Sequence, residues 1–243
     1  AQYEMALSRI NQKEYLVAQD ILKDLLEYPI QYKFKQKVYM QLGNAYDLNK
    51  QHEEGLTIYN EGLKYYPHQH NLLYKRGVCY ESLKDYDKAI ADYQAAILGN
   101  IYHSNSHLRL GIVAANNDLY EQALLSLMTF LWLSPDDSRA AEVVQIVNKL
   151  SDGTYEKTEM PLKDPKSYDN YAEYNELFVN RIALQDNYKT KFTIGVSYAK
   201  QLHLLLRNNQ YDEKNPDFWN QLYMRFYSQI WKEKQIDNLI LLR

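Results

Sequence analysis

Residues 36–69 read QKVYMQLGNAYDLNKQHEEGLTIYNEGLKYYPHQ and decide the fold, because their landmarks return at a fixed spacing further along the chain. Gly43 is followed by Gly77 and then by Gly111, each 34 residues after the one before. Three more columns keep the same step: a tyrosine (Tyr46, Tyr80), a small residue (Gly55, Ala89, Ala123) and a large one (Tyr59, Tyr93, Leu127). Four columns in register indicate a structural repeat rather than chance.

Each repeat is predicted to be a pair of facing helices. In the segment 39–46, large residues recur at i, i+3 and i+7, which is one stripe of a helix, and Gly43 lets a partner approach closely. A turn follows at 49–52, and the second helix alternates small and aromatic residues on its facing stripe (Gly55, Tyr59, Gly62). Pro67 ends the hairpin, since a proline cannot continue a helix interior. Each pair leaves apolar surface for the next pair to cover.

This pattern resembles the tetratricopeptide repeat (TPR), which has a large residue, Leu-Gly, a tyrosine, a small residue, an aromatic and a closing proline in a period of about 34 residues. The resemblance covers roughly 100 residues. It implies an all-α fold, a right-handed α-α superhelix or solenoid of helical hairpins. It also implies protein-protein interaction, in which a non-catalytic scaffold binds a peptide or a helix in a concave groove lined by the first helix of each repeat.

The sequence predicts three regions. Residues 1–150 form the TPR solenoid, with an irregular first repeat (1–35), regular repeats (36–69, 70–103, 104–135) and a capping helix (137–150). Residues 151–170 are a linker, and residues 171–243 form a C-terminal helical region without the repeat signature. We expect residues 1–150 to fold independently, because the repeats and their cap bury their apolar faces mostly among themselves.

Two residues or spacings depart from the repeat pattern, and the linker raises a separate question. Ala18 precedes Gly55 by 37 residues, so three extra residues are expected around the proline of Tyr28–Ile30. Arg76 stands where the repeat prefers leucine. The linker contains glycine and proline and has no periodicity, which fits either a solvated tether or a loop pinned against the fold.

The last helix is predicted to begin with Asn215 as its cap and Pro216 at its first position, and to run to about Gln235. Its stripe of large residues is wide enough to need two neighbours (Trp219, Leu222, Tyr223, Phe226, Ile230). The chain ends in an apolar run, so we expect the natural protein to continue past Arg243 and residues 171–243 to be truncated.

Composition narrows the classes of partner. The 243 residues are 46% hydrophobic and 14% aromatic, which supports a sizeable core. A net charge of -3, spread along the chain, provides no basic surface for nucleic acid. The longest uncharged run near the centre, 122–135, has 14 residues, fewer than the roughly 18 of a membrane span. The compartment stays open: the start at Ala1 fits a cytoplasmic protein or an exported one whose signal peptide has been removed.

The motifs predict no catalytic residue, no cofactor and no metal site. The glycines are too far apart for a GxGxxG or Walker loop. His103 and His107 have metal-ligand spacing, but no glutamate follows His103 as HExxH requires. The single cysteine, Cys79, lies beside Gly77 on a packing helix and is expected to be a small buried hydrophobe.

The candidate binding site is the stripe of first-helix residues that faces the groove, with Tyr3 and Leu7 at its open end. Its members are Met40, Asn44, Asp47, Tyr74, Val78, Glu81, Leu108, Arg109, Ile112 and Ala115. The alternative is that these residues are ordinary helix surface, because a fold alone does not give a function.

One TPR subgroup holds acidic C-terminal tails with a two-carboxylate clamp, and the resemblance can be tested against it. The clamp positions here hold Met40, Asn44, Lys75, Asn105 and Arg109, of which Asn44 and Arg109 match. Both clamp lysines are absent, and acidic tails need charge-assisted hydrogen bonds. The sequence therefore predicts a hydrophobic or aromatic ligand, with the protein's own linker or C-terminal helix as one candidate.

Two other functions remain open at this stage. One is an enzyme or ligand-binding site in residues 171–243, where the repeat pattern gives no guidance. The other is a structural subunit that self-associates through residues 219–231, whose aromatic side chains suit an interface. The oligomeric state is not predicted.

Overall fold

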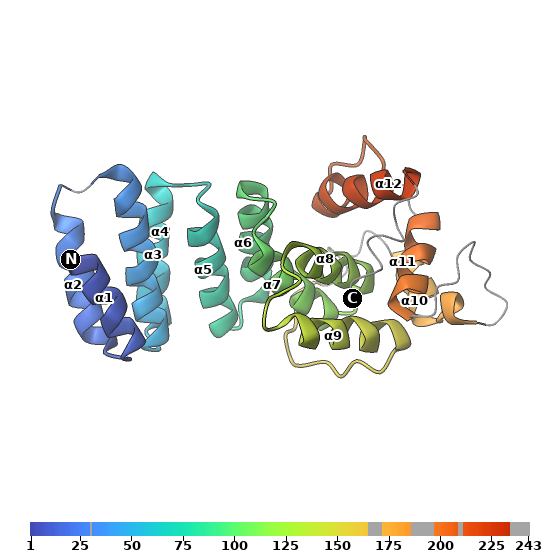
Figure 1. Ribbon diagram of the computed structural model, residues 1–243, viewed down its shortest axis with the longest axis horizontal. Helices are drawn as coiled ribbons and strands as arrows, with labels where there is room; N and C mark the ends of the chain where they lie inside the picture. Colours follow the sequence, from blue (N-terminus) through green and yellow to red (C-terminus); the bar gives the residue numbers. More distant parts are fainter. Residues whose placement is uncertain (30, 165–171, 186–196, 209–210, 234–243) are drawn as a thin grey trace. The chain divides into compact units, whose positions relative to one another are not determined.

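The computed structural model describes residues 1–29, 31–164, 172–185, 197–208 and 211–233, and every element in these ranges is helical. The end of the predicted linker, 165–170, and the last residues, 234–243, lie outside the described ranges. Eight helices form consecutive hairpins: α1 (Gln2–Asn11), α2 (Tyr15–Glu27), α3 (Tyr32–Leu48), α4 (His52–Tyr65), α5 (His70–Ser82), α6 (Tyr86–Gly99), α7 (Ser104–Ala115) and α8 (Tyr120–Leu133) (Figure 1). The all-α solenoid expected from the sequence is confirmed.

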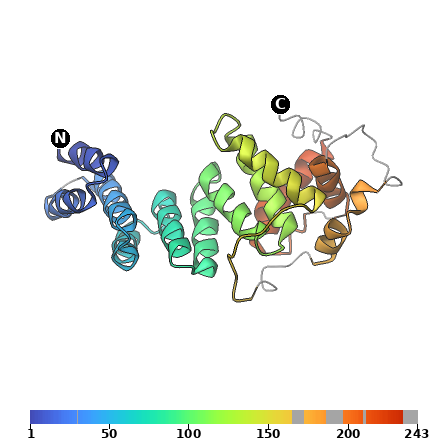
Figure 2. The same cartoon turned by 90° about the horizontal axis from the view of Figure 1, so that it is seen from below.

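The chain divides into two compact units, residues 1–106 and 107–243, and the division falls inside α7. In the first unit each helix from α1 to α6 packs against the next along the chain, which both views show (Figures 1 and 2). The second unit adds α9 (Ala140–Asp152), α10 (Ala172–Val179), η2 (Ile182–Leu184), α11 (Ser197–Asn208), the π-helical turn η3 (Asn220–Met224) and α12 (Arg225–Lys232).

The repeat is visible in the backbone of the turn inside each hairpin. Lys13, Lys50, Lys84 and Asp118 all adopt a left-handed conformation, with φ between 60° and 64°. The last three lie 34 residues apart, and Lys13 precedes Lys50 by 37. Few non-glycine residues adopt positive φ, so its return at one place in each hairpin identifies the first hairpin as a repeat too.

The glycines of the repeat lie where helices touch. A Cβ at Gly43 would come within 2.5 Å of Tyr59, one at Gly77 within 2.6 Å of Tyr93, and one at Gly111 within 2.8 Å of Leu127. In each of these three hairpins the contact joins residues 16 positions apart, from the first helix to the second. The expected contact of a small residue with a large one is therefore present in three hairpins.

The three extra residues of the first repeat do not lengthen the connection around Tyr28–Ile30, as the sequence predicted. Four residues separate α2 from α3, as many as separate α4 from α5. The additional residues instead form a first turn of α3, which has 17 residues against 13 in α5. That turn packs on the end of α4: the Tyr32 and Tyr66 rings lie 4.5 Å apart, and the Tyr66 hydroxyl donates to the Tyr32 carbonyl at 2.6 Å.

The helix α9 lies where the capping helix 137–150 was predicted, and its polar side chains Glu142, Gln145 and Lys149 are exposed. It ends at Gly153, which adopts φ 74° and donates its N–H to the Leu150 carbonyl at 3.2 Å, a left-handed cap that favours glycine. However, α9 also packs against α11, so packing in the second unit continues beyond the predicted end of the solenoid.

The last helix begins later than predicted. Asn215 and Pro216 are not its cap and first position: the helix starts at Phe218, and the Asp217 carboxylate accepts the N–H of Asn220 at 3.0 Å. The Asn215 side chain caps the turn that precedes the helix, where its oxygen accepts the N–H of Asp217 at 3.0 Å. Aspartate is as good an N-cap as asparagine, so the composition alone did not distinguish the two positions.

The boundary at residue 150 stays a prediction, and truncation tests it. A fragment of residues 1–150 should melt cooperatively if the repeats are self-sufficient, as the sequence suggests. A fragment of residues 1–164 retains a segment that binds the α7–α8 turn, described below, and should melt at a higher temperature. Circular dichroism on heating measures both. A non-cooperative transition in both fragments would contradict the boundary.

Candidate functional site

Six of the ten predicted groove residues lie on α3 and α5 in the first unit, and all six are half-buried: Met40, Asn44, Asp47, Tyr74, Val78 and Glu81. Half-burial follows from their place on the first helices, because one side of each residue packs on the hairpin and the other remains open to solvent. Tyr3 and Leu7 of α1 are also half-buried, and the Tyr3 ring meets Phe34 edge to face at 5.0 Å.

The polar members of this stripe bond to other parts of the chain. His52 and Asp47 pair at 2.5 Å between Nδ1 and Oδ1, and the Tyr93 hydroxyl donates to Glu81 at 2.6 Å. The ammonium group of Lys75 donates to the Asn44 side-chain oxygen at 2.8 Å. Asn44 and Lys75 occupy neighbouring clamp positions, so their mutual hydrogen bond would have to be shared or broken to hold a ligand carboxylate.

The apolar members offer a different surface. Met40 and Tyr74 pack against the core cluster of the second and third repeats, which includes Tyr39, Tyr59 and Leu73. The Tyr74 ring lies 5.0 Å from His103, edge to face, and 5.9 Å from Tyr93. These contacts fix its orientation while leaving part of the ring accessible. A half-exposed aromatic side chain held by its neighbours loses little entropy when a ligand binds.

The other four predicted residues lie on α7 within the second unit. Arg109 and Ile112 are half-buried, whereas Leu108 and Ala115 are buried. Buried residues of this kind contribute to packing and offer no surface to a ligand. The sequence pattern did not distinguish them, because the helical period gives the direction of a side chain but not what covers it.

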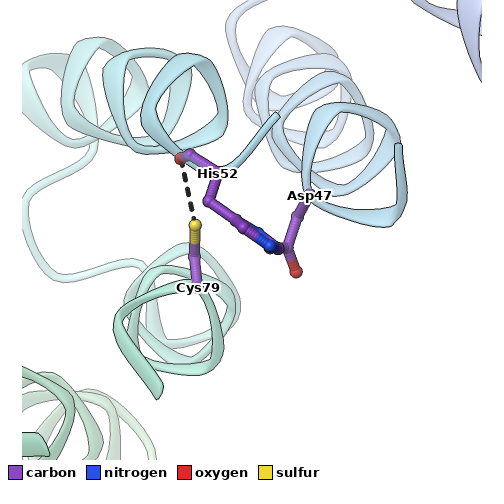
Figure 3. A group of neighbouring side chains, drawn as sticks. All are labelled: Asp47, His52 and Cys79. Carbon is purple, nitrogen blue, oxygen red and sulfur yellow. Dashed lines mark hydrogen bonds and ion pairs between the residues drawn. The ribbon is translucent and has the colours of Figure 1, made fainter. Parts of the chain in front are cut away.

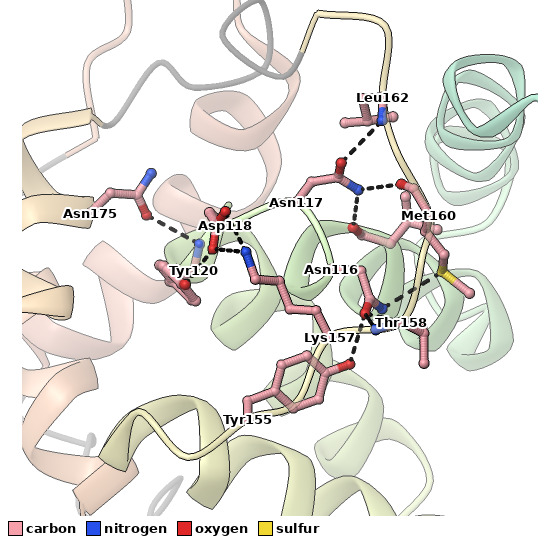
Figure 4. A network of polar contacts seen from close by, with 11 residues as sticks. Asn116, Asn117, Asp118, Tyr120, Tyr155, Lys157, Thr158, Met160, Leu162 and Asn175 are labelled. Carbon is pink, nitrogen blue, oxygen red and sulfur yellow. Dashed lines mark hydrogen bonds and ion pairs between the residues drawn. The ribbon is translucent and has the colours of Figure 1, made fainter.

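Residues 155–162 of the predicted linker are bound to the turn between α7 and α8 (Figure 4). The side-chain oxygen of Asn116 accepts the Thr158 N–H at 2.6 Å. Asn117 binds the segment twice, donating to the Met160 carbonyl at 2.8 Å and accepting the Leu162 N–H at 3.1 Å. These contacts favour the pinned loop over the solvated tether for this part of the linker.

The same turn carries an ion pair. The Lys157 ammonium lies 2.6 Å from the Asp118 carboxylate, which the Tyr120 hydroxyl also contacts. Burial opposes the charged carboxylate, but the hydrogen bonds from Lys157 and Tyr120 outweigh it and lower the pKa of Asp118. The Asp118 carboxylate is therefore charged at neutral pH. Three consecutive polar residues of one turn thus hold a segment that has no helix of its own.

The aromatic side chains of residues 219–231 make contacts within the second unit. The Tyr223 hydroxyl lies 2.6 Å from His107 Nδ1 on α7. The Tyr227 hydroxyl lies 3.0 Å from the Thr129 hydroxyl on α8 and donates to the Leu125 carbonyl at 3.2 Å. Trp219, Tyr223 and Tyr227 are buried, so less apolar surface is left for self-association than the sequence suggested.

Within the described residues, one group of side chains is close enough to hold a metal ion: Asp47, His52 and Cys79. Sequence motifs do not indicate this group, because its members come from three different helices, at spacings that match no metal motif. Gly43 and Tyr59, 16 positions apart, fix the register of α3 and α4, so a signal was present in the repeat itself.

Comparisons with known proteins agree with this architecture. Residues 36–69 and 70–98 each match a family described as tetratricopeptide repeat. A crystal structure of a tetratricopeptide repeat protein from Parabacteroides merdae ATCC 43184 is similar, with a TM-score of 0.52 and 14% sequence identity over 99% of this chain and 96% of that chain. At that identity the likeness shows the fold alone. A search of curated proteins found no match.

The fold, the glycine contacts and the two matched segments define a solenoid of helical hairpins. Within that solenoid, residues 36–69 and 70–98 are tetratricopeptide repeats, and repeats of this kind generally mediate protein-protein interactions. Among the described residues, no helix is both long enough and apolar enough to cross a membrane.

Proposed function

We propose that this protein is a non-catalytic interaction scaffold that binds a hydrophobic or aromatic peptide or helix along the first helices of its repeats. The proposal rests on a difference between the polar and the apolar side chains of α3 and α5. The polar side chains Asn44, Asp47 and Glu81 bond within the chain. Met40, Tyr74 and Val78 present half-exposed apolar surface beside them.

An amphipathic segment fits this stripe for a physical reason. A ligand that buries Tyr74 and Met40 removes apolar surface from water at roughly 25 cal/mol for each Å², without breaking an internal hydrogen bond. An acidic tail would have to compete with Asn44 for the Lys75 ammonium. Anchoring by aromatic and aliphatic residues at the centre of an interface is typical of groove-binding helices.

Peptide titration of the full chain tests the proposal. Fluorescence anisotropy would compare a labelled amphipathic aromatic peptide with a labelled acidic-tail peptide, each at low and high salt. We expect the aromatic peptide to bind more tightly and with little dependence on salt. Tyr74→Ala should weaken that binding about tenfold or more, as loss of an aromatic anchor does. Tyr102→Ala is the matched control, since Tyr102 is 69% exposed in the turn before α7, outside the stripe.

The opposite pattern would overturn the proposal. Tight, salt-sensitive binding of the acidic peptide that is lost in Arg109→Ala but unchanged in Tyr74→Ala would indicate a charge-based site. Because Tyr74 also packs on Tyr93, thermal melts must show that Tyr74→Ala stays folded. Val78→Lys provides a second variant, which places a charge on the stripe without removing an aromatic ring.

A further inference from the structure

Three potential metal ligands meet where the second hairpin contacts the third (Figure 3). Asp47 lies at the end of α3, His52 is the first residue of α4, and Cys79 lies within α5. One donor atom from each lies within 4.8 Å of the others. The imidazole and the carboxylate are paired at 2.5 Å, and the Cys79 thiol donates to the His52 carbonyl at 3.2 Å.

The site is enclosed and electrostatically negative. Cys79 is fully buried, and the side chains of Asp47 and His52 are 14% and 20% exposed. Burial first, and then the charges of Asp47 and Glu53, raise the pKa of the Cys79 thiol to about 12. A thiol in this position is inert as a nucleophile, but a bound cation would relieve the repulsion that keeps it protonated.

A fourth polar group adjoins the cluster. The Tyr59 hydroxyl is buried and has no hydrogen-bond partner among the described residues. Burial first, and then the charges of Asp47 and Cys79, raise the pKa of Tyr59. A buried hydroxyl without a partner costs free energy, and a ligand or a metal-bound water would satisfy it.

We infer that Asp47, His52 and Cys79 form a site for a divalent transition-metal ion, with Zn²⁺ as the preferred ion. One sulfur, one nitrogen and one oxygen donor suit zinc, and three protein ligands leave a fourth position for water. Tetrahedral coordination separates donor atoms by roughly 3.3–3.6 Å. The Asp47 and His52 side chains would therefore move apart by about 1 Å, and Cys79 would turn from the His52 carbonyl toward the ion.

Binding changes protonation in a defined way. The Cys79 S–H bond breaks as the metal–sulfur bond forms, and the proton passes to solvent, so no oxidant or reductant is needed. Affinity should then rise with pH, by about tenfold per pH unit for one released proton. The ion would tie the turn between α3 and α4 to α5 and thereby fix the contact of the second repeat with the third. This site does not depend on the proposed peptide binding.

Cobalt titration of the full chain, without an affinity tag and after treatment with a chelator, tests the inference. Co²⁺ bound to a thiolate gives a sulfur-to-metal charge-transfer absorption in the near ultraviolet, which reports Cys79 directly. We expect that band to appear at one equivalent and to disappear on addition of Zn²⁺, which should also raise the melting temperature. Cys79→Ser should abolish the band, and Asp47→Asn and His52→Gln should weaken binding tenfold or more.

His68→Gln is the matched control, because His68 is exposed and belongs to the loop after α4. Its metal affinity should equal that of the parent chain. The inference is wrong if the parent chain shows no thiolate band, or if zinc raises the melting temperature of Cys79→Ser as much as that of the parent. Asp47→Asn keeps the size of the side chain, so it separates loss of a ligand from loss of fold.

Discussion

Gly77→Leu should destabilise the protein by about 3 kcal/mol or more, because it places a branched side chain where two helices touch. Even the first added atom, a Cβ, would lie 2.6 Å from Cε1 and 2.9 Å from Cδ1 of Tyr93. That ring cannot move away easily, since it is fully buried and its hydroxyl donates to Glu81 at 2.6 Å. The helices would have to separate, which loses packing along the whole hairpin.

Chemical denaturation followed by circular dichroism measures the effect. Ala91→Leu is the matched control, because it adds the same side chain to an exposed position of α6 and should change stability by less than about 0.5 kcal/mol. Gly111→Leu should be milder than Gly77→Leu, since a flexible leucine, Leu127, faces Gly111. Removing the obstacle in Gly77→Leu/Tyr93→Ala should give a favourable coupling energy. A loss below about 0.5 kcal/mol for Gly77→Leu would show that the contact does not exist.

The sequence predicted these glycine contacts because they are local and periodic. Helix pairs joined by a short turn can pack in few ways, so a 34-residue spacing determines which residues of a hairpin face each other. The same reasoning placed Met40, Asn44, Tyr74 and Val78 on the accessible side of α3 and α5. Leu108 and Ala115 are buried, which was not predictable, because the helical period gives the direction of a side chain but not what covers it.

Contacts that involve segments outside the repeats could not be predicted from the sequence either. The binding of 155–162 to Asn116 and Asn117 joins positions about 40 apart, and no period relates them. The bond between His107 and Tyr223 spans 116 positions. The sequence left open whether the linker is a solvated tether or a loop pinned against the fold, and it did not indicate which side chains bind it.

One missed contact was within reach of the sequence. Arg76 and Asp92 are 16 positions apart, the same offset that pairs Gly77 with Tyr93 one residue later. The corresponding residues of the second repeat, 34 positions earlier, are Leu42 and Ile58. Leu42 belongs to the core cluster around Leu22, and the partly buried Ile58 packs against that cluster. The third repeat therefore replaces an apolar pair with an ionic one. The departure of Arg76 from the family pattern is thus accompanied by a second one, Asp92, at the position that faces it.

The ion pair that results is well formed. The Arg76 guanidinium donates from Nε to Asp92 Oδ2 at 2.7 Å and from Nη2 to Asp92 Oδ1 at 2.6 Å. A third bond, from Nη1, reaches Asn60 at 2.7 Å. The Asp92 side chain is only 6% exposed and that of Arg76 22%. Burial raises the pKa of Asp92, and Arg76 offsets part of that rise.

We therefore expect Arg76→Leu, which restores the residue that the repeat prefers, to destabilise the protein by about 3 kcal/mol, because it leaves a buried carboxylate without its cation. Arg76→Leu/Asp92→Ile, which copies the second repeat, should recover most of that loss, since well-packed apolar residues often replace a buried ion pair at little cost. Ala91→Leu again serves as the control for an added leucine on this hairpin. Chemical denaturation of the three variants at neutral pH gives the comparison.

The effect of Arg76→Leu should also depend on pH, with a definite sign. Without Arg76, the pKa of Asp92 in the folded protein rises further above its unfolded value of about 3.9. Below that unfolded value the carboxyl is protonated in both states, and its burial costs little. As the pH rises from the unfolded pKa to the folded pKa, the unfolded carboxyl gives up its proton while the folded one keeps it, so stability falls; it levels off once the folded carboxyl has ionised too. Arg76→Leu should thus lose more stability near pH 7 than near pH 4, whereas the double variant should show no such trend. An equal loss at both pH values, not recovered by Asp92→Ile, would mean that Arg76 stabilises the hairpin by packing alone.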